Sequence, residues 1–114
     1  MTHARFDTAL RVATSAGHIA RSYFEKASTL DVEHKGTQDL VSEADRETER
    51  HIASEILAAF PEDSFLGEEH GLTPGHDGSG TWVVDPIDGT QPFLLGLPTW
   101  CVSIAYVQIG RAHV

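Results

Sequence analysis

The chain contains little cysteine and few basic side chains. Its single cysteine, Cys101, cannot form a disulfide within the chain, so packing and hydrogen bonds must stabilise the fold. Lysine and arginine total 8 against 17 acidic residues, which gives a formal net charge of -9. Nucleic acid and anionic membranes attract basic surfaces, so this balance argues against both as partners. The sequence also lacks an apolar run long enough to span a bilayer and an apolar secretion signal at its start, and we expect a cytoplasmic protein.

The length of 114 residues and the hydrophobic fraction of 40% predict one domain with a modest core. Apolar residues recur at intervals of three and four over residues 2–24, which predicts an amphipathic helix. A second helix is predicted over residues 42–60, because Ser-Glu-Ala-Asp at its start resembles a capping box and Pro61 closes it. Between the helices, Leu30 and Val32 are the candidates for a short strand.

Short apolar runs bounded by Gly, Asp and Pro predict strands in the rest of the chain, at residues 64–66, 81–84 and 101–107. A Gly-rich loop at residues 70–80 is expected between the first two strands. Cys101 is interpreted as a small, buried hydrophobic residue. The predicted fold is an α+β layered sandwich, in which two helices pack on a mainly antiparallel sheet.

The most distinctive segment is Asp-Pro-Ile-Asp-Gly-Thr at residues 85–90, which follows an apolar strand. Strand ends that open into loops often carry functional side chains. Here Asp85 and Asp88 supply two carboxylates, and Gly89 and Thr90 supply free backbone groups and a hydroxyl. Asp-Pro and Asp-Gly are also common turn dipeptides, so the segment alone is equally compatible with a plain turn.

A second acidic segment, Gly67-Glu68-Glu69, also follows a predicted strand. Successive side chains of a strand alternate between faces, so one glutamate can point toward Asp85 and Asp88 if the strands are neighbours. The clustered carboxylates would repel each other unless hard divalent cations neutralise them. Mg²⁺ fits best, because it prefers oxygen ligands and keeps waters that can become nucleophiles. The alternative for an isolated glutamate pair is a solvated surface loop.

The third segment of interest spans residues 35–45 and ends at Asp45. In the structural interpretation, Asp45 lies in the first turn of the second helix and suits the helix dipole. In the functional interpretation, Asp45 orients the hydroxyl of Thr90, and the pair accepts a proton from attacking water.

In order and spacing, the three segments at residues 35–45, 67–69 and 85–90 resemble the inositol monophosphatase family, and the resemblance covers nearly the whole chain. It implies a magnesium-dependent phosphoric monoester hydrolase with two or three Mg²⁺ ions, a small phosphorylated metabolite as substrate, and a homodimer at full length. In such an enzyme a metal-activated water attacks phosphorus in line, without a covalent phosphoenzyme. Residues 1–114 would form the N-terminal part of a single domain whose C-terminal half is absent.

The resemblance also implies roles for individual residues. The implied metal ligands are Glu68, Asp85, the backbone carbonyl of Ile87, and Asp88. The implied catalytic residues are Asp45, Thr90 and Glu68. The implied substrate-binding residues are Asp88, Gly89 and Thr90, whose N-H groups can hold a phosphate. Glu69 and Lys35 would support the site from outside, and Lys35 would balance its negative charge.

Two departures from the family pattern leave alternatives open. The family supplies a further metal-binding aspartate from a Trp-Asp-x-x-Ala-Gly motif, which this sequence does not contain. We therefore expect little or no catalysis by the 114 residues alone, and a metal-binding, catalytically incomplete fragment is the alternative of another class. Residues 91–100 are closer to the histidinol-phosphate phosphatase-like branch than to inositol phosphatases, so both substrates stay open.

Other metal-dependent classes fit the sequence less well. Haloacid dehalogenase phosphatases use Asp-x-Asp-Gly-Thr, whereas Pro86 and Ile87 here separate the two aspartates by one residue more. An EF-hand requires alternating ligands that this segment lacks. No pair among the seven histidines has the spacing of a zinc site.

Overall fold

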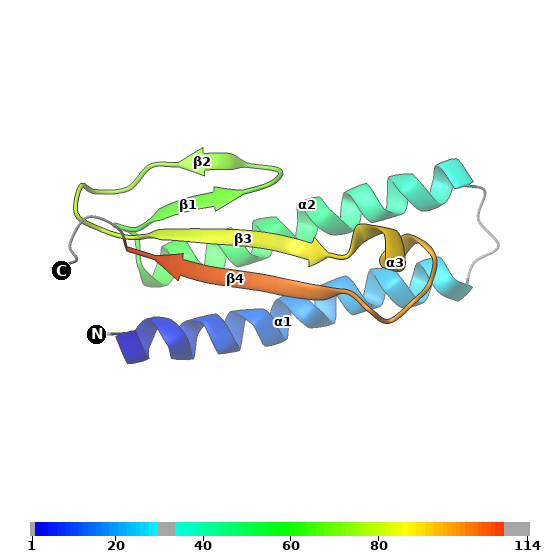
Figure 1. The fold of residues 1–114 in the computed structure, drawn as a ribbon, viewed down its shortest axis with the longest axis horizontal. Helices are drawn as coiled ribbons and strands as arrows, with labels where there is room; N and C mark the ends of the chain where they lie inside the picture. Colours follow the sequence, from blue (N-terminus) through cyan, green and yellow to red (C-terminus); the bar gives the residue numbers. More distant parts are fainter. Residues whose placement is uncertain (1, 30–33, 109–114) are drawn as a thin grey trace.

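A computed structural model of the chain describes residues 2–29 and 34–108, and describes side chains for residues 4–26 and 39–108. Two long helices, α1 (Thr2–Thr29) and α2 (His34–Ala59), run side by side along one face of a four-stranded sheet (Figure 1). This arrangement confirms the predicted layering of two helices on a sheet. Among the described residues, no helix combines the length and the apolarity that a bilayer span requires.

Both helices are longer than the sequence indicated. α1 continues past the predicted end at residue 24, and α2 begins at His34 rather than at Ser42. The capping-box interpretation of residues 42–45 is therefore wrong, because these residues lie inside α2. The physical reason is tertiary packing: Val41 and Ala44 are buried in a cluster with residues of α1, which stabilises the helix upstream of Ser42. The possible strand residues Leu30 and Val32 lie outside the described residues.

The sheet has the order β2-β1-β3-β4. Its strands are β1 (Ser64–Gly67), β2 (Gly71–Thr73), β3 (Thr81–Asp88) and β4 (Cys101–Val107). β2 and β4 pair antiparallel with their neighbours, whereas β1 and β3 are parallel. The three predicted strands are present, while β2 and the short helix α3 (Thr90–Leu94) were not predicted.

The main core lies between the helices and the sheet. β3 buries Trp82 and Val84 toward the helices and exposes Val83 on the other face, as the two-residue period of a strand requires. The buried members of the cluster are Val12, Ala16, Ile52, Ile56, Phe65, Trp82 and Val84. Burial of each larger side chain contributes about 1.5–3 kcal/mol. A second cluster, which includes Ile87 and Phe93, packs residues 87–94 against the two helices.

β4 corrects one prediction. Cys101 is exposed rather than buried. The strand alternates between exposed and half-buried residues, and Cys101 lies on the same face as the exposed residues Ser103, Ala105 and Val107. An apolar, β-branched run predicted a strand correctly, but it did not say which face the cysteine would occupy.

Candidate active site

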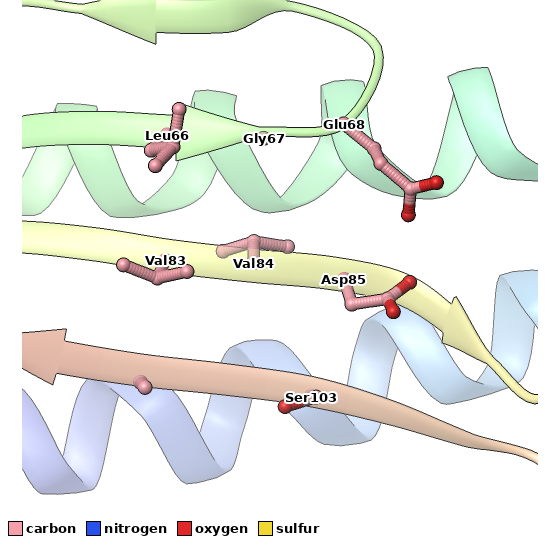
Figure 2. Close-up of a pocket in the computed structure, with 8 residues that line it drawn as sticks. Leu66, Gly67, Glu68, Val83, Val84, Asp85 and Ser103 are labelled. Atoms are coloured by element: carbon pink, nitrogen blue, oxygen red, sulfur yellow. The ribbon is translucent and has the colours of Figure 1, made fainter.

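The carboxyl ends of β1 and β3 lie at the same edge of the sheet, because these two strands are parallel neighbours. Gly67 is the register partner of Val84, which brings Glu68 next to Asp85. Both acids follow a buried residue by one position, so both side chains point to the sheet face that is turned away from the helices. Figure 2 shows Glu68 just beyond the end of β1, with its carboxylate extending toward Asp85 in the neighbouring strand β3. The condition set by the sequence, that these strands are neighbours, is met.

The two acids line an open groove of ≈ 420 Å³ on this face of the sheet. Its floor is formed by short or apolar side chains of the three neighbouring strands, among them Leu66, Val83 and Ala105. Ser103 of β4, the register partner of Asp85, adds a hydroxyl at the acidic end. The groove is therefore apolar along most of its floor and acidic at one end.

Carboxylate repulsion and burial both raise pKa values at this end of the sheet. Asp85 raises the pKa of Glu68 by charge repulsion, and partial burial and a hydrogen bond between the two carboxyl groups raise it further. Asp45, half-buried on α2, has its pKa raised to about 7. Burial is the largest cause, followed by the charges of Glu69, Glu68 and Asp85. The structure thus brings Asp45, Glu68, Glu69 and Asp85 within mutual electrostatic reach.

One oxygen of Asp85 has no hydrogen-bond partner. This atom, Oδ1, is buried, and an unpartnered buried acceptor costs about 1–3 kcal/mol or more when charged. A bound cation would satisfy it, so the donor set fits a hard metal ion. In the part of the chain that the structure describes, no three His, Cys, Asp or Glu side chains are close enough to hold one ion by themselves. Mg²⁺ does not require such a cage, since it usually binds one or two carboxylates and keeps several waters.

The segment from Asp85 to Asp88 contains an irregularity in the strand pairing. Asp85 pairs with Ser103 and Asp88 with Cys101, so β3 has one residue more than β4 between these pairs. Such a bulge changes the direction of the following side chains. Asp88 is exposed beyond it. The intervening residues Pro86 and Ile87 are both buried and still belong to β3, so the strand continues past its predicted end at residue 84.

Gly89 lies between the end of β3 and the start of α3. Its φ of 100° and ψ of 49° lie in the left-handed region, which favours glycine. A Cβ atom at this position would also lie 3.0 Å from the carbonyl oxygen of Thr99. The next residue, Thr90, is exposed, and its hydroxyl donates to the carbonyl of Ile87 over a long 3.4 Å. The predicted pairing of Thr90 with Asp45 stays a prediction, as do the roles of Asp88 and Gly89.

Sequence reasoning missed one buried acid beneath this site, Glu49 of α2. It follows Asp45 by four residues, and residues with this spacing share a helix face. That spacing was the available signal. Lys35, which was predicted to balance the charge, lies in α2, but its side chain is outside the described ones.

The fold defines a class of α+β proteins in which two helices cover one face of a mixed sheet, and here two acidic side chains, Glu68 and Asp85, lie side by side on neighbouring strands. The sequence profile described as the inositol monophosphatase family matches residues 3–114, and the chain belongs to this family. The predicted resemblance is confirmed.

Individual relatives carry two kinds of name. The chain is 40% identical over 113 residues to the Nus factor SuhB of Vibrio cholerae, covering 98% of this chain and 42% of that protein. It is 43% identical over 96 residues to the inositol-1-monophosphatase of Rhizobium meliloti, covering 84% of this chain and 36% of that protein. The chain therefore spans about two fifths of the length of the curated relatives it matches.

Solved structures agree with the fold. The extragenic suppressor protein suhB from Bartonella henselae superposes with a TM-score of 0.77 at 33% identity, over 92% of this chain and 39% of that one. The inositol monophosphatase from Anabaena superposes with a TM-score of 0.76 at 29% identity, over 96% and 38% of the two chains.

Proposed function

We propose that this chain forms the metal-binding part of a magnesium-dependent hydrolase of small phosphate monoesters. The observation that carries the proposal is the Asp85 carboxylate, which has a buried oxygen without a partner and lies beside the carboxyl group of Glu68. Two carboxylates held this close repel each other unless a cation lies between them. Membership of the inositol monophosphatase family supports the same chemistry.

Magnesium would be held by oxygen atoms of the two strand ends and the turn: Glu68, Asp85, the carbonyl of Ile87, and Asp88. When bound, two or three Mg²⁺ ions would supply positive charge that acidifies water and neutralises the phosphate. The buried side chain of Ile87 keeps its backbone in place against the core, whereas the exposed Asp88 can reach an ion and the substrate.

The remaining residues act on the substrate and on protons. Gly89 and Thr90 offer backbone N-H groups to the phosphate from a turn that only glycine forms easily. The Thr90 hydroxyl takes a proton from the attacking water and passes its own proton to Asp45. Burial is the largest cause of the raised pKa of Asp45, and a carboxylate with a raised pKa is a stronger base. Glu69 and Lys35 support the cluster from outside.

We further propose an inositol monophosphate-like substrate, since relatives named inositol-1-monophosphatase are 43% and 41% identical to the chain. Histidinol phosphate is the alternative substrate that residues 91–100 favour. The domain boundaries 1–114, the cytoplasmic location and a homodimer at full length remain proposals.

A non-catalytic role is the second candidate, and the relatives named Nus factor SuhB support it, at 40% and 41% identity. In that case the acidic cluster would bind a metal ion without turnover.

The test compares phosphate release from inositol 1-phosphate and histidinol phosphate by the protein at its full natural length, with and without Mg²⁺. We expect Mg²⁺-dependent release that Asp85→Asn abolishes, while the exposed loop variant Asp77→Asn keeps wild-type rates. Wild-type rates in Asp85→Asn would reject the catalytic assignment. Mg²⁺ binding in calorimetry without release from either ester would favour the non-catalytic role.

A further inference from the structure

Glu49 is a buried acid that points at the backbone. Its side chain is completely buried in α2, and both of its oxygens accept the N-H of Glu69, at 3.1 and 3.0 Å. Oε2 also accepts the N-H of His70 at 2.7 Å and lies 2.5 Å from Nδ1 of the His70 ring. Hydrogen bonds to an ionised group are roughly twice as strong as neutral ones. One carboxylate therefore fixes two consecutive peptide groups of the β1-β2 turn.

Gly67 lies against the same carboxylate from the other side. A Cβ atom at residue 67 would lie 2.5 Å from the carboxylate carbon of Glu49 and 2.6 and 2.7 Å from its oxygens. Real Cβ atoms do not approach so closely, so any other residue would displace the Glu49 carboxylate. The Glu49 carboxylate thus occupies the space that a side chain at residue 67 would need.

Glu68 lies between these two fixed points. Gly67 is packed on the Glu49 carboxylate, and Glu69 donates its N-H to it. With the backbone held on both sides, the Cα-Cβ bond of Glu68 can point only toward the opposite face, where Asp85 lies (Figure 2).

We infer that Glu49 is a positioning residue, which holds the Gly67–Glu69 turn so that the Glu68 carboxylate lies beside Asp85. The kinetic part of this inference rests on the proposed phosphatase function, whereas the structural part does not. Groups that orient a metal ligand typically change metal affinity 10- to 100-fold when they are removed.

A purely structural role is the competing explanation, and Asp63 provides the matched control. Asp63 is also a buried acid, but it precedes β1, whereas Glu49 holds the residues that follow it. Asp63 and Glu68 are five positions apart, which corresponds to roughly 16 Å of extended chain. Loss of Asp63 should therefore reduce stability without moving Glu68.

The experiment uses the protein at its full natural length and compares Glu49→Gln, Glu49→Ala and Asp63→Asn. Calorimetry measures the dissociation constant for Mg²⁺, and hydrogen exchange by NMR measures protection of the Glu69 and His70 amides without metal. We expect Glu49→Gln to weaken Mg²⁺ binding roughly 10-fold and Glu49→Ala roughly 100-fold, with loss of amide protection in both. kcat should fall while KM for the ester changes little. Asp63→Asn should lower Tm and leave Mg²⁺ binding and both amides unchanged.

Two outcomes would overturn the inference. One is a Glu49 variant that lowers Tm as Asp63→Asn does but binds Mg²⁺ with wild-type affinity. The other needs no variant: Glu69 and His70 amides that exchange in the wild-type protein as fast as an unprotected turn. If the wild-type protein releases no phosphate, the proposed function fails, and Mg²⁺ affinity together with amide protection still decides the role of Glu49.

Discussion

Asp63 and Asp85 lie toward opposite ends of the central strands, and their carboxylates have different surroundings. Asp63, before β1, accepts hydrogen bonds from Nε and Nη2 of Arg5 at 2.9 and 3.0 Å and from Nε1 of Trp82 at 2.9 Å. The Arg5 guanidinium lies over the rings of Phe60 and Tyr106, at 4.6 and 4.7 Å from their centroids, and Asp63 raises the pKa of Arg5. Every requirement of this charge is met within the chain.

At the opposite end, none of the side chains that the structure describes forms an ion pair with Asp85. The buried oxygen of Asp85 lacks a hydrogen-bond partner, and the neighbouring Glu68 adds a second carboxyl group. A protein that holds its counter-ion permanently gains stability, whereas one that leaves the position open can exchange ions and ligands. The Asp63 end is therefore a structural anchor, and the Asp85 end is the candidate site.

After Asp85→Asn, the largest loss of turnover is expected from Thr90→Ala, at the same end of the sheet. Removal of the hydroxyl should lower kcat at least about 100-fold, because positioned proton transfer contributes 10²- to 10⁴-fold. Mg²⁺ affinity should change little, since the hydroxyl now donates only weakly to the Ile87 carbonyl. Steady-state kinetics and Mg²⁺ titration of the full-length protein measure both. A normal turnover number would reject this role for Thr90.

At the Asp63 end, Asp63→Ala should reduce the free energy of unfolding by about 3 kcal/mol. The substitution leaves the partly buried Arg5 guanidinium and the Trp82 N-H without their carboxylate partner. Urea denaturation measures the change. The control is Glu55→Ala, which breaks the exposed pair of Glu55 with Arg11 and should cost less than about 1 kcal/mol. Equal losses in the two variants would remove the distinction between anchor and surface pair.

In the absence of metal, Asp85→Asn should not destabilise the protein as Asp63→Ala does. It removes one charge from a repelling cluster, so the metal-free protein should keep or raise its Tm. The stabilisation that Mg²⁺ gives to the wild-type protein should disappear. Thermal unfolding in chelator and in excess Mg²⁺ tests this, and a clear drop in Tm in chelator would show that Asp85 is a stabilising acid like Asp63.

The smallest effect concerns pH. The pKa of Asp45 rises from 3.8 to about 7 on folding, so between these values the native state binds more protons than the unfolded state. Stability of the metal-free protein should therefore fall as pH rises through this window. Asp45→Asn should flatten the dependence, which is measured by urea denaturation at several pH values in chelator. An unchanged slope would contradict the assigned shift.

Local patterns predicted the parts of the fold that local chemistry determines. Short apolar runs predicted β1, β3 and β4, and the acidic residues after two of them predicted that Glu68 and Asp85 would lie close together. The start of α2 was missed, because Val41 is held in the helix by contacts with α1 that no local signal reveals.

Glu49 was missed for a related reason. A glutamate inside a helix is most often solvated. The N-H groups that donate to the buried Glu49 carboxylate come from residues 20 and 21 positions away in the sequence. Asp63 likewise obtains its cation from Arg5, 58 residues earlier. Buried charges depend on distant partners, whereas strand and turn signals lie within a few residues.

The contacts of Arg5 with Asp63 and Tyr106 also affect the order in which the chain can fold on the ribosome. Arg5 lies over Tyr106, so 101 residues of synthesis separate the two halves of this contact. At about 5–20 residues per second, the interval lasts roughly 5–20 s. During that time α1 can pair with α2, but the part of α1 that packs on β4 stays uncovered. We expect ribosome-bound chains ending before β4 to recruit chaperones, and chains of the full length to release them.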